Sequence, residues 1–318
     1  MRSKLNSKEA GNIKINILGQ EDSSRVVMKP IVALVKSKGH YDGVREALRL
    51  IEDKIKEDLK GKRKILVKPN FVSTSRELSA THVDAVRAVL DVISKYHSGK
   101  IIIGEGPASS SLRSGLRNFG YLKLEKEYDI EFVDLNEDDY VELEGFDSQM
   151  RPLKLRMSKT LIESDYRISV ALPKTHDCVI ATLSIKNIVV GGLVNGEKGR
   201  IHQGYKAINL NIAKLAKHVM PNLGVIDGFV GMEGRGPVSG DPVNLRAAAA
   251  SFHPVSLDAV MCRIMGFNPL DIGYLYYLDK WGIGVADLEG IEIIGESIED
   301  LARRFKPHPN YREMLNWR

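Results

Sequence analysis

Residues 171–205, ALPKTHDCVIATLSIKNIVVGGLVNGEKGRIHQGY, carry the densest group of reactive side chains in the chain. They continue an apolar segment, Tyr166–Leu172, whose composition predicts a buried strand. Polar residues follow the strand, and then an apolar run typical of a helix reaches Val190. This order of strand, polar loop and helix is the repeating unit of a doubly wound α/β sheet.

The same alternation extends in both directions from this segment. The predicted strands are Ile13–Leu18, Val26–Val35, Lys64–Val67, Lys100–Gly104, Glu131–Leu135, Tyr166–Leu172, Gly224–Val230, Ala247–Ser251 and Ile291–Ile294. The predicted helices are Tyr41–Leu59, His82–Tyr96 capped by Thr81, a segment ending near Tyr128, a short helix ending at Leu161–Glu163, Ala207–Met220, His253–Met265, Tyr274–Trp281 and Ser297–Phe305. Residues 136–144 and 150–157 predict a hairpin or edge strands.

This pattern predicts an α/β protein with a mainly parallel, doubly wound sheet and a smaller C-terminal α/β lobe. The expected division is a polar N-terminal segment at 1–24, a main lobe at 25–220 and a C-terminal lobe at 221–318 that completes a crevice. A chain of 318 residues is long enough to bury a large core.

Composition narrows the classes of protein. The chain has 46 Lys and Arg against 41 Asp and Glu, for a net charge of +5. This surplus is too mild for a dedicated nucleic-acid binder, so nucleic acid is not the expected partner. Its two cysteines, Cys178 and Cys262, favour neither a disulfide scaffold nor an iron–sulfur cluster. No apolar run approaches the roughly 18 residues that span a bilayer, so we expect no membrane partner and a cytoplasmic setting.

Ligands of such sheets bind beyond the carboxyl ends of the strands. Four loops are expected there: Lys68–Ser79, Gly104–Ser111, Pro173–Asp177 and 231–240. The residues predicted to bind an anionic substrate are Lys68, Asn70, Gly104, Glu105, Gly106, Ser109, Lys174, Asn187, Glu233 and Arg235. A stretch that approaches a phosphate-binding loop, GGLVNGEK at 191–198, has Glu197 where that motif requires lysine, and we reject it.

His176, Lys186 and His202 are the predicted catalytic residues. A histidine in a polar loop can act as acid, base or metal ligand, so His176 and His202 are also the predicted metal ligands. Lys186 interrupts an apolar run, which favours a partly buried ammonium that binds an anion or acts as a nucleophile. The alternative is a lysine whose stem covers apolar surface while its charge reaches water. Five Lys and Arg in residues 171–206, against Asp177 and Glu197, indicate a field that attracts anions.

The order of these motifs resembles domain-of-unknown-function family 362. The matching segments are Lys68-Pro69-Asn70, Gly104-Glu105-Gly106, Pro173 to Asn187, Asp227 to Gly240, and Leu257 to Val260. Many members of that family carry ferredoxin-type cysteine motifs, which this chain lacks. Because those cysteines are missing, an iron–sulfur cluster is not the expected cofactor.

The family is in turn remotely similar to the nickel-pincer lactate racemases. Those enzymes use a histidine after a strand, a lysine that holds the cofactor, and a histidine that ligates nickel; His176, Lys186 and His202 occur here in that order, 10 and 16 residues apart. The resemblance implies a racemase- or isomerase-like enzyme, with a divalent metal or a nickel-pincer-type nucleotide as cofactor. The alternatives are a non-catalytic metal- or cofactor-binding protein and a weak nucleic-acid binder, and assembly into a homo-oligomer is left open.

Overall fold

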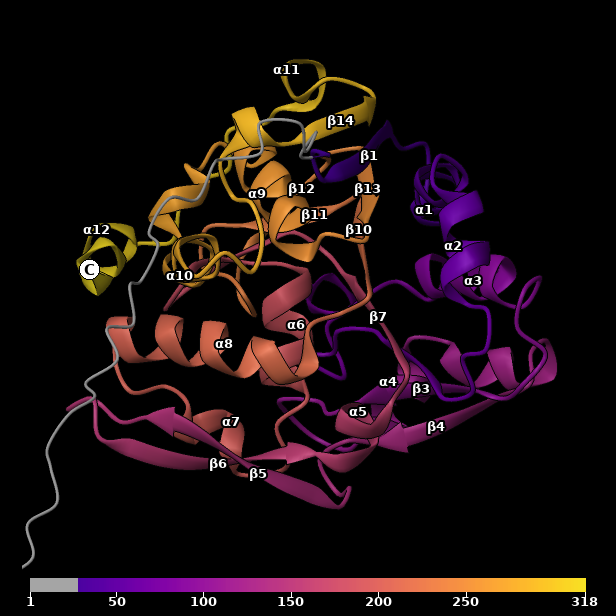
Figure 1. Ribbon diagram of the computed structural model, residues 1–318, viewed down its shortest axis with the longest axis horizontal. Coiled ribbons are helices and arrows are strands. Elements are labelled where there is room, and N and C mark those ends of the chain that lie inside the picture. The colour runs from indigo at the N-terminus through magenta and orange to yellow at the C-terminus, as the bar shows by residue number, and fades with distance from the viewer. Residues whose placement is uncertain (1–27) are drawn as a thin grey trace, which may run out of the picture.

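A computed structural model describes residues 28–318. Its main element is an eight-stranded sheet in the order β14-β1-β13-β10-β7-β2-β3-β4 (Figure 1). These strands are β1 (Ile31–Lys36), β2 (Ile65–Lys68), β3 (Ile101–Glu105), β4 (Ile130–Asp134), β7 (Tyr166–Ala171), β10 (Leu223–Gly228), β13 (Ala247–Ser251) and β14 (Glu292–Gly295). Only β13 runs antiparallel to its two neighbours, so the predicted mainly parallel sheet is confirmed.

Helices cover both faces of the sheet (Figure 1). One face carries α1 (His40–Arg49), α2 (Glu52–Asp58), α3 (Val83–Ile93) and α4 (Leu112–Asn118). The other carries α6 (Ser184–Gly191), α8 (Tyr205–Val219), α9 (Pro254–Ile264) and α10 (Gly273–Lys280). Successive side chains of a strand point to opposite faces, so Ile65 and Val67 join one core while Leu66 joins the other. The central strands are therefore mainly apolar, as expected for a sheet buried on both sides, and charged residues such as Lys68 and Glu105 occur at their carboxyl ends.

Two smaller sheets flank this framework. A four-stranded sheet has the order β12-β11-β8-β9, and β5 pairs with β6 as the predicted hairpin. Their strands are β5 (Tyr140–Phe146), β6 (Pro152–Ser158), β8 (Lys174–His176), β9 (Ile180–Thr182), β11 (Gly231–Glu233) and β12 (Asp241–Val243). The remaining helices are α5 (Lys159–Glu163), α7 (Glu197–Arg200), α11 (Ile298–Leu301) and α12 (Tyr311–Met314), with 3-10 turns at Glu77–Ser79, Tyr121–Lys126, Pro269–Asp271, Leu288–Gly290 and Leu315–Trp317.

Several predicted elements are corrected by the structure. The helix expected over 41–59 is two helices, because Ile51 leaves the helical conformation at φ −124° and ψ 16°. The cap of α3 is His82, whose side chain accepts from the Asp84 amide, whereas the Thr81 hydroxyl is used by the Val170 carbonyl and the Asn70 amide. The helix expected at 297–305 is only α11, and a further helix, α12, was missed.

Other differences concern loops and the ends of the chain. The helix expected to reach Tyr128 ends at Asn118 and is followed by a separate 3-10 turn. The predicted loop at 173–177 contains strand β8, and the loop from residue 231 begins with β11. The expected strand at 13–18, and the first two residues of that at 26–35, lie outside the described residues.

The division of the chain near residue 220 stays a prediction. Strands β10, β13 and β14, from the predicted C-terminal lobe, pair with strands of the main lobe in one continuous sheet. Within residues 28–318, no helix combines the length and apolar character that crossing a membrane requires.

Candidate functional site

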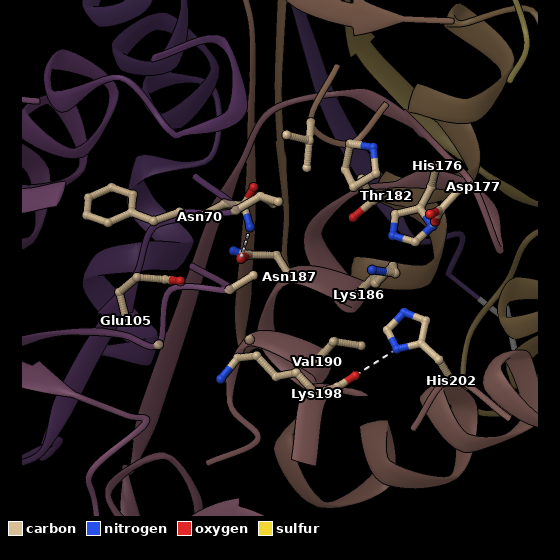
Figure 2. Close-up of a pocket in the computed structure, with 17 residues that line it drawn as sticks. Asn70, Glu105, His176, Asp177, Thr182, Lys186, Asn187, Val190, Lys198 and His202 are labelled. Atoms are coloured by element: carbon tan, nitrogen blue, oxygen red, sulfur yellow. Dashed lines mark hydrogen bonds and ion pairs between the residues drawn. The ribbon is translucent and has the colours of Figure 1, made fainter. Parts of the chain in front are cut away.

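A pocket of about 240 Å³ lies where the loops after β2 and β3 meet β8, β9 and α6. Seven of the predicted site residues line it: Asn70, Glu105, Gly106, His176, Lys186, Asn187 and His202. In Figure 2, Lys186 lies between His176 and His202 on one side of the pocket, while Asn70, Asn187 and Glu105 lie on the other. Residues far apart in the chain thus meet at one edge of the sheet, as the doubly wound topology predicts.

Helix α6 carries Lys186 and Asn187 into the pocket, and Asp258 of α9 fixes its first turn. The Asp258 carboxylate accepts from the Ser184 amide at 3.0 Å, the Ser184 hydroxyl at 2.5 Å and the Ile185 amide at 3.0 Å. These bonds satisfy donors that every helix leaves free at its N-terminus. Burial raises the pKa of Asp258 to about 7, against the opposing effect of the Ser184 bonds.

Lys186 is a buried ammonium that faces the pocket, and no group within the described part of the chain pairs with it. Only 7% of the residue is exposed. Among residues 28–318, its Nζ makes no hydrogen bond or ion pair with another side chain or carbonyl. Burial lowers the pKa of Lys186 to about 8, so the group is mainly charged at neutral pH and can release a proton slightly above it. The interpretation as a lysine extended along the surface is therefore wrong.

His176 lies in the buried strand β8, not in the polar loop that the sequence suggested. Burial, and then the charge of Lys186, lower its pKa to about 3, so the ring is neutral. Its Nδ1 lies 3.1 Å from the Cys178 amide and 2.9 Å from Asp177 Oδ1, and one nitrogen cannot accept and donate at once. The amide is fixed, whereas the Asp177 carboxylate is half-exposed and can turn into water. We therefore assign Nδ1 as acceptor, which leaves the ring proton on Nε2.

His202 offers the complementary arrangement. Its Nδ1 lies 2.7 Å from the Lys198 carbonyl, which only accepts, so Nδ1 carries the proton and Nε2 keeps a lone pair. His202 as a whole residue is exposed at the edge of the pocket, but partial burial of its ring, and then the charge of Lys186, lower its pKa. The two imidazoles are nearly parallel, at 13°, with centroids 6.5 Å apart. The pocket thus contains one histidine that donates from Nε2 and one that accepts at Nε2.

The opposite side of the pocket rests on a buried ion pair. Lys68 Nζ donates to Glu105 Oε2 at 2.5 Å, to Asn187 Oδ1 at 3.0 Å and to the Pro69 carbonyl at 3.1 Å. Burial lowers the pKa of Lys68 despite the attraction of Glu105. Asn187 also donates to the Lys68 carbonyl and to Ser169, which ties α6 to β2 and β7. Lys68 itself does not line the pocket; it supports residues that do.

Lys174 is buried and Lys198 is half-buried, and both are engaged by internal acceptors. Lys174 Nζ donates to Asn70 Oδ1 and to the Ser79 carbonyl, and burial, with Lys186 as a lesser cause, lowers its pKa to about 7. Lys198 Nζ donates to Asn136 Oδ1 and the Leu193 carbonyl, and burial lowers its pKa to about 8. Fewer lysines are therefore available to attract an anion than the count of basic residues in the sequence suggested.

Six predicted binding residues do not line this pocket: Lys68 and Lys174, described above, and Gly104, Ser109, Glu233 and Arg235. Gly104 packs beneath Leu66 and Leu135, and Ser109 is exposed, with its hydroxyl 3.3 Å from the Val72 carbonyl. Glu233 accepts from the Lys306 amide at 2.8 Å, and Arg235 is exposed to solvent. The pocket also contains residues that the sequence did not single out, among them Phe71, Asp177, Thr182, Lys198 and Val238. Asp177 and Lys198 both belong to residues 171–205, but only the fold shows which residues of that segment line the pocket.

One group in residues 28–318 has the spacing of a metal site. Nitrogen, oxygen and sulfur atoms of His176, Asp177 and Cys178 all lie within 4.8 Å of one another. Burial raises the pKa of Cys178 to about 12, so its sulfur is a thiol in the absence of a cation and a weak ligand. His202, the second predicted ligand, is not part of this group, although its Nε2 lone pair is free to bind a metal.

The fold and the pocket define an α/β protein with a pocket at the carboxyl edge of its sheet. Residues 65–263 match the family described as "Domain of unknown function (DUF362)", and the chain belongs to that family. A curated relative, a thylakoid-associated protein of Synechocystis sp., is 28% identical over 228 residues, which cover 69% of this chain and 68% of that protein.

Two solved structures show more distant likeness. The lactate racemase apoprotein of Thermoanaerobacterium thermosaccharolyticum aligns with a TM-score of 0.49 and 18% identity, covering 71% of this chain and 55% of that one. A Thermotoga maritima protein aligns with a TM-score of 0.39 and 12% identity, covering 64% of this chain and 54% of that one. This chain thus spans about half the length of these two proteins.

Proposed function

We propose that this protein is an enzyme that acts on a small anionic metabolite, a carboxylate or phosphate, in the pocket of Lys186. The observation that carries the proposal is the ammonium of Lys186, which is buried, faces the pocket and has no internal partner among residues 28–318. Holding a charge in such a place is costly unless a ligand compensates for it. An anionic ligand supplies that compensation.

The histidines give the pocket a means of moving protons. A carbon acid bound through its carboxylate to Lys186 would lose a proton from the α-carbon to His202 Nε2, and the electron pair would remain on the substrate as an enolate. The His202 imidazolium would exchange its proton with solvent and return one to the same carbon, while the neutral His176 would donate a hydrogen bond from Nε2 to the enolate oxygen. Both rings are within reach of one small molecule, since their centroids are 6.5 Å apart. Such an exchange is racemase- or isomerase-like chemistry.

A cofactor fits the same residues. Lys186 has an amine free to hold a carbonyl-bearing group such as a nickel-pincer-type nucleotide, and His202 Nε2 is free to bind its metal. Such a group would supply hydride-transfer chemistry, while Lys186 and His202 would hold it and His176 would serve the substrate. A metal ion, or the absorbance of a pyridinium group, found in natively purified protein would favour the cofactor mechanism over direct proton transfer.

Deuterium exchange tests the proposal without knowledge of the natural substrate. The protein is incubated in D₂O with a panel of 2-hydroxy and 2-amino carboxylates, including lactate, and NMR follows the α-proton. We expect exchange for at least one compound, and a loss of about 100-fold or more in Lys186→Met and His202→Gln. Ser109→Ala, outside the pocket, should leave the rate unchanged. Exchange that survives both pocket substitutions would contradict the proposal.

A second candidate is a metal-binding protein without turnover, which the group of His176, Asp177 and Cys178 favours. Metal analysis of untagged protein tests it, with Cys178→Ser as the variant that should lose the ion. We further propose a cytoplasmic setting, which agrees with Cys178 and Cys262 both being free thiols. No feature within residues 28–318 is offered in support of assembly into a homo-oligomer or of nucleic-acid binding.

A further inference from the structure

A second cluster of titratable side chains lies at the same edge of the sheet, outside the Lys186 pocket. It consists of His40 at the start of α1, His82 before α3, and Asp227 near the end of β10. These residues line a pocket of about 350 Å³ together with Glu77, Leu78, Ala80, Leu172 and Val230. None of the described residues that line it belongs to the Lys186 pocket, although the segment 70–82 contributes different residues to each.

Hydrogen bonds fix the tautomer of His40. Its Nδ1 lies 2.6 Å from Asp227 Oδ2, and Asp227 Oδ1 accepts from the Phe229 amide at 3.2 Å. A carboxylate only accepts, so in the neutral ring Nδ1 carries the proton and Nε2 keeps a lone pair. No other bond of the His40 ring occurs within residues 28–318, and its side chain is 24% exposed. His40 therefore offers one oriented acceptor to the pocket.

The neighbouring imidazole has the opposite tautomer. His82 Nδ1 accepts from the Asp84 amide at 3.2 Å, so the neutral ring carries its proton on Nε2, which lies 3.6 Å from Glu77 Oε1. The rings of His40 and His82 stack at 9° with centroids 4.0 Å apart. Because only one of the two rings has a free lone pair, this pair is poorly arranged to chelate a metal ion.

The charges around the pair have one sign. The ionised groups that act on His40 are Asp227 of β10, Asp84 of α3 and Glu77 of the 3-10 turn before it; no lysine or arginine lines the pocket among the described residues. An anion would be repelled here, in contrast with the Lys186 pocket. The rest of the lining is apolar, contributed by Leu78, Ala80, Leu172 and Val230.

We propose that this second pocket binds a small primary ammonium ion with an apolar tail, whose N–H donates to His40 Nε2. Glu77 at the rim and Asp227 behind the ring favour the positive charge, and the aliphatic side chains receive the tail. The site does not depend on the function proposed for the Lys186 pocket, because the two share no lining residue.

The proposal predicts a definite dependence on pH. Burial by itself would lower the pKa of His40, but the bond to Asp227 and its charge outweigh burial and raise it. Burial and the charge of His40 lower the pKa of His82. An alkylammonium stays charged up to about pH 10. Binding should therefore weaken as pH falls through the raised pKa of His40, where the ring loses its lone pair and becomes a cation.

Calorimetric titration of the full chain with n-butylammonium at about pH 8.5, below the ordinary pKa of an amine, tests the site, with butyrate and butyramide as matched probes. We expect butylammonium to bind more tightly than both. His40→Gln and Asp227→Asn should each weaken it by about tenfold or more, while His218→Gln, an exposed histidine of α8, should have no effect.

Three results would overturn the proposal. The first is equal or tighter binding of butyrate or butyramide, and the second is absence of butylammonium binding at millimolar concentration. The third is loss of binding in Lys186→Met with retention in His40→Gln, which would place the amine in the first pocket. The first two results would leave the function proposed for the Lys186 pocket untouched. The third would contradict it as well, because that pocket is proposed to bind anions. Failure of the amine site can therefore be told apart from failure of the enzyme function.

Discussion

Lys186 and Lys68 are both buried lysines beside the same pocket, and they differ in what meets their ammonium groups. Lys68 is fully buried and donates to Glu105, Asn187 and the Pro69 carbonyl. Lys186 has no comparable acceptor within residues 28–318 and faces the cavity. A charge with every donor satisfied holds the framework together, whereas a charge left without a partner is available to a ligand.

The largest expected loss of stability comes from breaking the buried ion pair of Lys68 and Glu105. Glu105→Gln leaves the Lys68 ammonium buried beside a neutral amide, because the carboxylate at 2.5 Å is gone. We expect the free energy of unfolding to fall by about 3–5 kcal/mol, measured by urea denaturation near neutral pH. The matched control is Glu142→Gln, which removes an exposed pair with Lys154 and should leave the free energy of unfolding nearly unchanged. Equal costs would show that burial does not distinguish the two pairs.

Asp258→Asn loosens the helix that presents Lys186. The amide cannot accept from both the Ser184 and Ile185 donors, so we expect a loss of about 1–3 kcal/mol in unfolding free energy. Burial holds the pKa of Asp258 at about 7, above that of the unfolded chain, so its contribution to stability declines as pH rises from about 4 to 7. Denaturation across this range should show that slope in the natural protein and not in the variant. Asp287→Asn, at an exposed cap, serves as control.

Gly191→Ala tests how tightly the Lys68 side chain is packed. An added Cβ would lie 2.3 Å from Lys68 Nζ and 2.6 Å from its Cε, and Lys68 is held in place by its three acceptors. We expect a loss of about 1–3 kcal/mol in a thermal or urea melt. Gly199→Ala is the control, because nothing lies within 4 Å of its added Cβ, and the helix α7 should gain slightly. A neutral result at Gly191 would mean that Lys68 can move freely.

Lys186→Met should change stability least, with a loss below about 1 kcal/mol or a gain. Burial lowers the pKa of Lys186 to about 8, below that of an unfolded lysine, so folding is disfavoured wherever only the unfolded chain holds the proton. The natural protein should therefore gain stability as pH rises from about 8 to about 10, and the variant should lack this gain. A large loss near neutral pH would reveal an internal partner and remove the contrast with Lys68.

Much of the fold could be predicted from the sequence because each strand is a short apolar run between turn residues. Ala247–Ser251, AAAAS, was predicted to the residue, although its antiparallel direction was not. Helix breaks were missed at Ile51 and after Asn118, where apolar spacing continues across a change in backbone conformation. The capping role of His82 was assigned to Thr81, because the sequence cannot show that the Thr81 hydroxyl is used by β7.

For the pocket, the residue types and their order along the chain pointed to His176, Lys186 and His202, which all line it, while their catalytic role stays a proposal. What they could not decide is which bases are free. Lys174 and Lys186 are 12 positions apart and both follow buried strands. The ammonium of Lys174 donates to Asn70 and Ser79, whereas neither of these residues accepts from Lys186. The sequence alone thus determined the α/β class and the chemistry present at the sheet edge. Only the tertiary structure decided where each charge is used, because the partners come from distant strands that the fold brings within hydrogen-bonding distance.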